Sequence, residues 1–278
     1  MGNLATDTDL DGQDGHYRGT LSEDWRIWGP AGGYIASVAL RAAGLESGRA
    51  RPASINAQFC RAGAFDEVDV HVAVLRETRV ATALDVEIRQ DGELLLKAAV
   101  WGVDQLDGLE HHTDDEPGPL PGPDGIPSTS ERMADQDGPS HPFWHNLENR
   151  QPHWVDDWDN RPAMEAARGE WFRFVPQDRF ADPWVDACRA LVLIDVGSWP
   201  VAVLPHTGEL DWFAPTTEVT ARFIGDGRDH EWLQSWAWAP VATGGLVGAR
   251  GEVRSREGRL LALGGSTLLC RPAARRPE

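Results

Sequence analysis

Asp195 is the residue whose surroundings point most directly to chemistry. It lies within ALVLIDVGSWPVAVL, an apolar stretch in which a carboxylate needs either a partner or a task. Burial there would raise its pKa toward neutrality and suit it to general-base work on a water molecule. The alternative is structural, with Asp195 breaking or capping a helix that bends at Gly197 and Pro200. The residues alone leave both interpretations open.

Motifs of several common catalytic classes do not occur in the sequence. It has no G-x-S-x-G elbow, P-loop, GxGxxG or HExxH. Ser198 lacks the elbow's glycines two residues before and after it and is best explained as a helix serine. Five histidines gather in one irregular Pro, Gly and Asp-rich stretch, whereas a catalytic metal needs ligands on rigid elements. We therefore expect no metal and no cofactor.

The chain looks duplicated, with two similar sets of predicted strands. These elements must hold Asp195 in place. Apolar residues alternate at Val68, Val70, Val72 and Val74, as expected for half-buried strands. A similar run of strands follows in the second half. The hairpin turn at residues 91–92 recurs at 257–258, which is 166 residues later.

One strongly apolar helix is predicted ahead of each set of strands, over residues 30–47 and 183–204. A buried helix followed by antiparallel strands, repeated twice, favours an α+β fold of two similar domains. The predicted boundaries are a flexible N-terminus (1–16), a first domain (17–103), a linker (104–169), a second domain (170–272) and a tail (273–278). The aromatic residues in the later part of the linker are expected to pack on the domains.

Several short motifs, in a common order, resemble the acyl-CoA thioesterase II family. Asp195 is followed by PVAVLPH from Pro200, similar to that family's Asp, four residues, Pro-Val-Ala and Pro-His pattern. GGYIASVAL from Gly32 resembles the start of its first central helix, and FCRAG from Phe59 resembles a strand end. PTTEVTARF from Pro215 resembles the strand that supplies a catalytic threonine. The resemblance covers residues 17–102 and 171–272.

This resemblance implies a double hot-dog fold, with two antiparallel sheets that each wrap around a central helix. The family's Asp, Thr and Gln orient a nucleophilic water, and the first two fall on Asp195 and Thr216. The glutamine position is occupied by Ser266, whose side chain is shorter, and Thr267 and Gln234 are the candidates to compensate. Only one of Ser266 and Thr267 can face the pocket, because strand side chains alternate.

Hydrolysis also needs donors at the thioester carbonyl oxygen. The backbone N–H groups of Gly32 and Gly33, with Tyr34 beside them, are the candidates, because a helix start favours negative charge. The alternative is that these glycines serve close packing. Both interpretations stay open.

Candidate substrate contacts are aromatic and basic. Trp28, Trp199 and Trp212 lie near the predicted helices and could line an acyl pocket. Arg61 and Arg222 are candidates for the phosphates of CoA.

Composition limits the partners and the location. The chain has 26 Lys and Arg residues against 44 Asp and Glu, a net charge of −18 that disfavours nucleic acid. Three scattered cysteines encode no disulfide framework, so a cytoplasmic location is expected. No apolar run is long enough to span a membrane, and a homodimer is possible because hot-dog sheets leave edge strands.

Three functions are compatible with these residues. The first is an acyl thioesterase that hydrolyses acyl-CoA or acyl-carrier thioesters through a water activated by Asp195. The second is a biosynthetic hot-dog enzyme that dehydrates, cyclises or releases a bulky polyketide-like chain. The third is a non-catalytic acyl-binding protein, since the glutamine is replaced.

Overall fold

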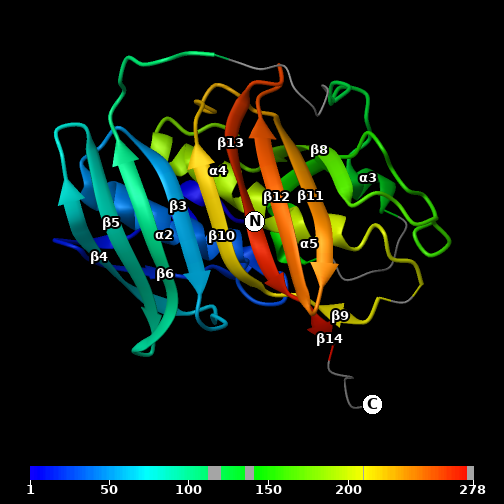
Figure 1. Cartoon of the computed structure of the whole chain (residues 1–278), viewed down its shortest axis with the longest axis horizontal. Helices are drawn as coiled ribbons and strands as arrows, with labels where there is room; N and C mark the ends of the chain where they lie inside the picture. Colours follow the sequence, from blue (N-terminus) through cyan, green and yellow to red (C-terminus); the bar gives the residue numbers. More distant parts are fainter. Residues whose placement is uncertain (112–119, 135–140, 209, 274–278) are drawn as a thin grey trace.

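The structure, a computed structural model, describes residues 1–111, 120–134, 141–208 and 210–273. Twelve strands form one antiparallel sheet that curves in front of two long helices (Figure 1). From edge to edge the sheet contains β1 (Asp11–Gln13), β2 (His16–Thr20), β4 (Glu67–Glu77), β5 (Ala81–Gln90), β6 (Glu93–Val103), β3 (Arg51–Phe59), β10 (Thr216–Phe223), β13 (Leu260–Leu269), β12 (Leu246–Arg254), β11 (Leu233–Thr243), β8 (Ala167–Phe174) and β7 (Leu147–Arg150). A separate small pair joins β9 (Trp212–Phe213) to β14 (Arg271–Pro272).

The two halves of the chain meet at a seam between β3 and β10. These strands pair antiparallel, with Ile55 opposite Ala221. The sheets expected for the two halves are thus joined side by side into one continuous sheet of twelve strands. Pairing β3 with β10 satisfies backbone groups that two separate sheets would leave open at their edges. The other expected feature, one long helix against each half, is present.

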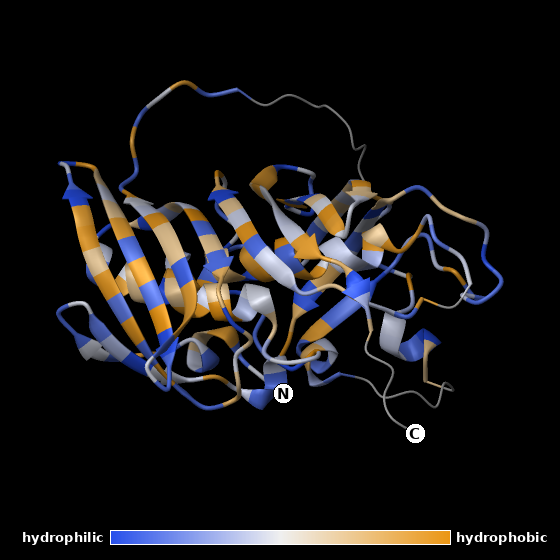
Figure 2. Ribbon diagram, turned by 60° about the horizontal axis from the view of Figure 1, so that its bottom comes forward, coloured by the Kyte–Doolittle hydropathy of each residue, from blue (hydrophilic) through white to orange (hydrophobic). Residues whose placement is uncertain are grey.

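Alternation of apolar and polar residues explains which side of the sheet faces the helices. Val68, Val70 and Val72 of β4 are 8% exposed or less, and orange and blue bands alternate along the strands in Figure 2. Val74, predicted to continue this row, is 46% exposed. The register between β4 and β5 shifts after Val74, so the buried row ends there.

Two apolar helices, α2 (Gly32–Ser47) and α4 (Pro183–Val196), fill the inner side of the sheet. They run antiparallel, because Gly33 near the start of α2 lies against Val192 near the end of α4, and Gly44 lies against Trp184. The second predicted helix is divided, with α5 (Ser198–Ala202) following Gly197. Pro200 has no N–H to continue the α4 hydrogen bonds. No helix in the described ranges is long and apolar enough to cross a membrane.

Much of the segment between the halves packs on the second half. It contains α3 (Thr129–Arg132), η2 (Pro142–Asn146) and β7, which pairs with β8 at the edge of the sheet. Phe143 is fully buried, with its ring 5.8 Å from that of Trp25 in η1 (Glu23–Trp25). On the other face of the sheet, Leu120 packs with Trp171 and Trp232. This segment thus covers both faces of the second-half sheet near β8.

The N-terminal residues take part in the core. Residues 1–16, predicted to be flexible, contain α1 (Leu4–Asp7) and β1, and Leu4 is only 1% exposed. The Gly2 N–H donates to the Asn146 side-chain oxygen at 2.7 Å, which joins this segment to η2. Of the predicted tail, residues 274–278 lie outside the described residues.

Candidate active site

The carboxyl group of Asp195 lies where three elements meet. Asp195 is the next-to-last residue of α4 and is 9% exposed. Its Oδ2 accepts the N–H of Gly33, near the start of α2, at 2.7 Å. Its Oδ1 accepts the hydroxyl of Thr216, the first residue of β10, at 2.8 Å. The fold thus brings together three predicted site residues from distant parts of the chain.

The start of α2 accommodates a carboxylate that comes from another helix. Its N-cap residue, Ala31, has no side-chain oxygen, so the first N–H groups lack a local cap. A Cβ atom on Gly32 would lie 3.0 Å from Asp195 Oδ2, and one on Gly33 would lie 2.8 Å from Val192 Cα. The two glycines therefore allow close helix packing and also give the carboxylate access to the positive end of α2.

Burial raises the pKa of Asp195 above its ordinary value, and this is the largest influence on it. The hydrogen bonds from Thr216 and Gly33 oppose the rise, as does the nearby hydroxyl of Ser266. No ion pair among the described residues includes Asp195. A buried carboxyl with a raised pKa and only neutral donors has the properties of a general base.

Ser266 of β13 shares the inner side of the sheet with Asp195. It pairs with the buried Val219, whereas Thr267 alternates to the opposite side. Ser266 is 5% exposed, and its Oγ has no hydrogen-bond partner among the described residues. Gln234 uses its side-chain amide on two backbone carbonyls at the β12–β13 turn. Neither Thr267 nor Gln234 therefore replaces the glutamine of the family pattern.

The three candidate donors to the thioester carbonyl oxygen differ in whether their N–H or O–H group is already hydrogen-bonded. The Gly33 N–H is already bonded to Asp195, whereas the Gly32 N–H has no partner among the described residues. The Tyr34 hydroxyl donates to the Asp7 carbonyl at 2.7 Å and accepts the Ser22 N–H at 3.0 Å. Tyr34 is fully buried, so its hydroxyl serves the N-terminal segment. Gly32 is the candidate with an available donor.

A cavity of about 630 Å³ begins beside the end of α4. Val196 and Gly197, the two residues that follow Asp195, both line it. The rest of its apolar wall comes mainly from α5, β8 and the segment between the halves, and includes Pro200, Val201, Phe172, Trp144 and Leu147. The inter-half segment therefore forms one side of a cavity at the end of α4, and the Asp195 side chain is not among those that line it.

Two charged residues of this cavity were missed at the level of the sequence. Arg168 and Glu170 of β8 line the cavity together with Phe172. Strand alternation in ARGEWFRF places Arg168, Glu170, Phe172 and Phe174 on one face. Two charges on an otherwise aromatic face were the signal that could have identified them.

The three tryptophans predicted for the acyl pocket do not line this cavity. Trp28 is 50% exposed, with its ring 4.7 Å from that of Phe213. Trp212 is 47% exposed, and Trp199 packs against the small apolar cluster beneath α5. Tryptophan content alone did not separate cavity walls from other surfaces.

The two candidate phosphate-binding arginines lie in different places. Arg61 is exposed and pairs with Glu93 at 2.7 Å. Arg222 stands between the inward-facing Ala221 and Phe223, so its guanidinium lies on the other side of the sheet from Asp195.

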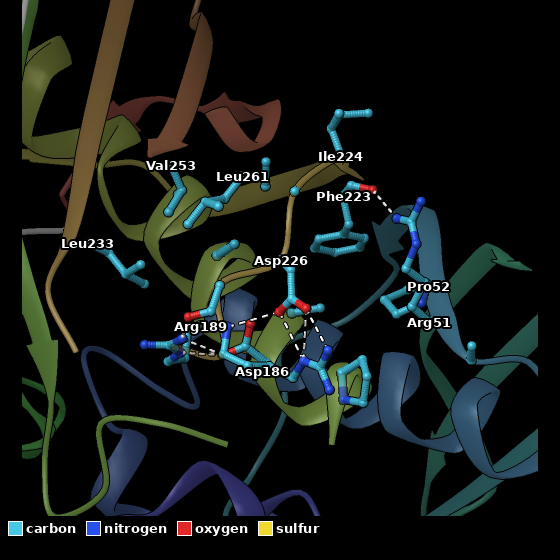
Figure 3. A pocket seen from close by; sticks show the side chains of 18 of the residues that line it. Arg51, Pro52, Asp186, Arg189, Phe223, Ile224, Asp226, Leu233, Val253 and Leu261 are labelled. Atoms are coloured by element: carbon cyan, nitrogen blue, oxygen red, sulfur yellow. Dashed lines mark hydrogen bonds and ion pairs between the residues drawn. The ribbon is translucent and has the colours of Figure 1, made fainter. Parts of the chain in front are cut away.

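A second cavity, of about 500 Å³, lies toward the other end of α4. Asp186 and Arg189 lie next to each other on its floor, below the side chains of Leu233, Val253 and Leu261 (Figure 3). Arg189 is 0% exposed, and its guanidinium binds Asp186 and three backbone carbonyls. This charge pair is internally satisfied.

Cysteine and metal chemistry find little support in the described residues. Burial raises the pKa of the Cys188 thiol to about 12, which disfavours a nucleophilic thiolate. Partial burial also raises the pKa of Cys270. In the described ranges, no three His, Cys, Asp or Glu side chains gather where they could hold a metal ion.

Solved structures similar to this chain share the hot-dog fold. A protein of unknown function with a hot-dog fold from Alicyclobacillus acidocaldarius has a TM-score of 0.82 and 19% identity, with 98% of each chain covered. The acyl-CoA thioesterase II TesB2 from Mycobacterium marinum has a TM-score of 0.79 and 20% identity, covering 99% of this chain and 100% of its own. A putative thioesterase II from Thermobifida fusca has a TM-score of 0.80 and 18% identity, with 98% of each covered.

Family models give a more specific result than these structures. No curated protein matches the sequence. The model of the acyl-CoA thioesterase N-terminal domain matches residues 21–103, and that of the acyl-CoA thioesterase C-terminal domain matches residues 123–268. The two matches cover both halves and most of the chain, so this protein belongs to the acyl-CoA thioesterase family.

Proposed function

We propose that this protein hydrolyses acyl thioesters with a water molecule that Asp195 activates. One feature supports this above all: a buried carboxyl whose pKa is raised and whose donors, Gly33 and Thr216, are neutral. Each Asp195 oxygen accepts one of these bonds and keeps a second lone pair. That lone pair is available for a proton of water.

The roles of the neighbouring hydroxyls follow from their hydrogen bonds. Thr216 donates its proton to Asp195 Oδ1, which fixes the carboxylate and leaves the Thr216 oxygen able to accept from water. Ser266 has a buried Oγ on the same side of the sheet, near Asp195, with no hydrogen bond of normal geometry among the described residues. A water between Ser266 and Asp195 would satisfy this hydroxyl and span the space that a longer side chain would fill.

In the proposed reaction, water attacks the thioester carbonyl carbon while the Asp195 carboxylate takes one of its protons. Negative charge moves to the carbonyl oxygen, where the free N–H of Gly32 at the start of α2 stabilises it. The C–S bond then breaks, and the proton on Asp195 passes to the sulfur. The products are a carboxylic acid and a thiol, and Asp195 returns to its ionised state.

The proposed substrate is a thioester of CoA or of a carrier-protein phosphopantetheine, since both present the same reacting group. The Phe59 ring at the end of β3 lies against Gly32, and Arg61 follows it two residues later. Arg61 is thus the better placed of the two arginine candidates for phosphate. A cytoplasmic location and a homodimer belong to the same proposal.

Release of free thiol from a panel of acyl-CoAs tests the proposal. Asp195→Asn should reduce kcat/KM by about 10²–10⁴, the usual contribution of a general base. Thr216→Val should reduce it less. Thr220→Val provides the matched control, because Thr220 occupies the same strand but faces the outer side of the sheet, and it should keep full activity.

The outcome of this panel also decides between the rival functions. Ser266 in place of glutamine is the observation that favours a different reaction at the same carboxyl, such as dehydration of a 3-hydroxyacyl thioester. Formation of an enoyl thioester, lost in Asp195→Asn, would replace the hydrolytic proposal. Tight binding of acyl-CoA with no turnover would instead indicate an acyl-binding protein.

A further inference from the structure

The cavity beside Asp195 has a charged strip across an otherwise apolar wall. Arg168 and Glu170 project into it from β8, at 15% and 12% side-chain exposure. We infer that this strip recognises oxygen-bearing groups on the distal part of the acyl chain, so that the preferred substrates are hydroxylated or oxo-substituted acyl thioesters. The inference rests on the proposed function, because it assigns the cavity to the acyl group.

Hydrogen bonds from the segment between the halves hold the charged strip in place. Arg168 Nε lies 2.5 Å from Glu170 Oε1. Glu170 Oε2 accepts the side-chain amide of Asn149 at 3.2 Å. Asn149 Oδ1 in turn accepts from Thr129 at 2.5 Å and from Gln151 at 3.1 Å. This network ties the strip to the segment between the halves.

The strip nevertheless has unused hydrogen-bonding capacity. Arg168 Nε and Glu170 Oε1 contact each other as an ion pair, whereas the other two guanidinium nitrogens of Arg168 donate to no described residue. Because Arg168 lines the cavity, the N–H groups of these two nitrogens are available to an oxygen acceptor within it. A hydroxyl or carbonyl oxygen of a ligand would be such an acceptor.

The position of the strip indicates which part of the chain it meets. Gly197 packs against Ala237 of β11, and Arg168 pairs with Ala237 on the neighbouring strand. Arg168 therefore lies one strand spacing, about 5 Å, beyond the wall that touches the end of α4. A chain whose thioester is held at Asp195 would have to pass the end of α4, where Val196 and Gly197 line the cavity, before its distal carbons reach the strip.

The charge of the strip selects among polar groups. Arg168 and Glu170 neutralise each other, so a neutral hydroxyl or carbonyl fits better than a carboxylate, which Glu170 would repel. A plain alkyl chain would cover the remaining N–H groups of Arg168 and leave them without an acceptor. Sites of this kind discriminate strongly against analogues that lack the oxygen, and we expect at least about a tenfold preference.

The test uses CoA thioesters matched in length that carry a plain methyl end, an ω-hydroxyl, an ω-oxo group or an ω-carboxylate. Dissociation constants are measured calorimetrically with Asp195→Asn, which is not expected to turn them over, and kcat/KM is measured with the unaltered chain. The hydroxylated or oxo chain should bind at least about tenfold more tightly than the plain chain. The double substitution Arg168→Met with Glu170→Met should reverse this ratio.

This double variant should fold, because replacing a buried ion pair by apolar residues of similar volume is often neutral or stabilising. Arg173→Met is the matched control, since Arg173 lies on the same strand, faces away from the cavity and pairs with Glu148. It should keep the preference of the unaltered chain. Its melting temperature, measured beside that of the double variant, separates folding from recognition.

Every outcome separates the two proposals. Equal binding of plain and hydroxylated chains, or an unchanged ratio in the double variant, would overturn the inference even if hydrolysis occurs. Preference for the ω-carboxylate would overturn the assignment of a neutral group. A hydroxyl preference that depends on Arg168 and Glu170, without thiol release, would support the recognition strip and contradict the hydrolytic proposal alone.

Discussion

The two ends of α4 each bury an aspartate, but the two carboxyl groups are treated differently. Asp186 near the start pairs with Arg189 (Figure 3). Arg189 is itself fully buried and donates to three backbone carbonyls. Asp195 near the end has no cation partner among the described residues and accepts hydrogen bonds from the neutral groups of Gly33 and Thr216. Burial raises the pKa of both carboxyl groups. The difference is that a cation offsets the burial of Asp186, whereas only neutral donors offset the burial of Asp195.

The two ends of α4 also differ in how they contact α2. At the Asp195 end, glycines at the start of α2 leave space for a carboxylate. At the other end, the Trp184 ring fills the corresponding place against Gly44, and its indole N–H donates to the Arg49 carbonyl at 3.0 Å. With the 166-residue repeat, Thr216 and Ser266 correspond to Ala50 and Val100. The two helices therefore meet through polar groups at the Asp195 end of α4 and through packed side chains at the Trp184 end.

The largest expected difference concerns stability at the two aspartates. Asp186→Ala should reduce the free energy of unfolding by about 3–5 kcal/mol, because it leaves Arg189 buried without its counter-charge. Asp195→Asn should cost no stability near neutral pH, since it removes a buried charge. Urea titrations of both variants measure this difference. Equal losses would mean that Asp195 is a structural cap.

A smaller effect should distinguish the two glycine contacts between the helices. A methyl group on Gly33 would lie 2.8 Å from Val192 Cα, and one on Gly44 would lie 2.7 Å from the Trp184 ring. Both Gly33→Ala and Gly44→Ala should therefore destabilise the protein by about 1–3 kcal/mol through overpacking. Only Gly33→Ala should lower kcat, because it displaces the N–H bonded to Asp195. If Gly44→Ala lowers kcat equally, general loosening of the helices would explain both effects.

The raised pKa of Asp195 predicts how activity and stability change with pH. Activity requires the ionised carboxylate, so the acid limb of kcat/KM should lie above the ordinary aspartate range. The folded state favours the protonated form. Its contribution to stability is therefore present below the unfolded value of 3.8 and is lost as pH rises through the folded pKa.

Comparison with Asp195→Asn isolates this contribution. As pH rises, the unaltered chain should lose stability relative to the variant. The difference between their unfolding free energies should then level off above the folded pKa. A difference that moves the other way would indicate a lowered pKa and a carboxylate stabilised by its donors. The same series with Asp186→Ala would show whether the Arg189 pair titrates.

Sequence periodicity predicted the features of the fold that depend on local structure. The hairpins, the buried helices and the exceptional position of Asp195 depend on spacing along the chain, and each is found close to where it was expected. The role of Ser266 as the inward-facing member of its pair also follows from alternation, once the register with Val219 is known. Local signals, in short, located the carboxyl.

Contacts between distant segments could not be predicted in the same way. The seam between β3 and β10, the bond from Gly33 to Asp195 and the wall supplied by Trp144 all join residues far apart in sequence. Tyr34 shows the opposite error, since its place beside the glycines suggested a substrate contact while its hydroxyl binds Asp7 and Ser22. Helix neighbours point in different directions, and only the packing decides which one faces the site.

The smallest expected effect concerns the hydroxyl of Ser266, which lies at the Asp195 end of α4. Ser266→Ala removes a buried Oγ that has no protein partner, so the unfolding free energy should change by less than about 1 kcal/mol. Its kcat should fall by less than about tenfold, because a water that bridges to Asp195 keeps the bonds from its other partners. A loss as large as that of Thr216→Val would place Ser266 in direct contact with the attacking water. A loss of stability without a change in kcat would instead make this hydroxyl part of the packing, as Val100 is at the corresponding position of the first half.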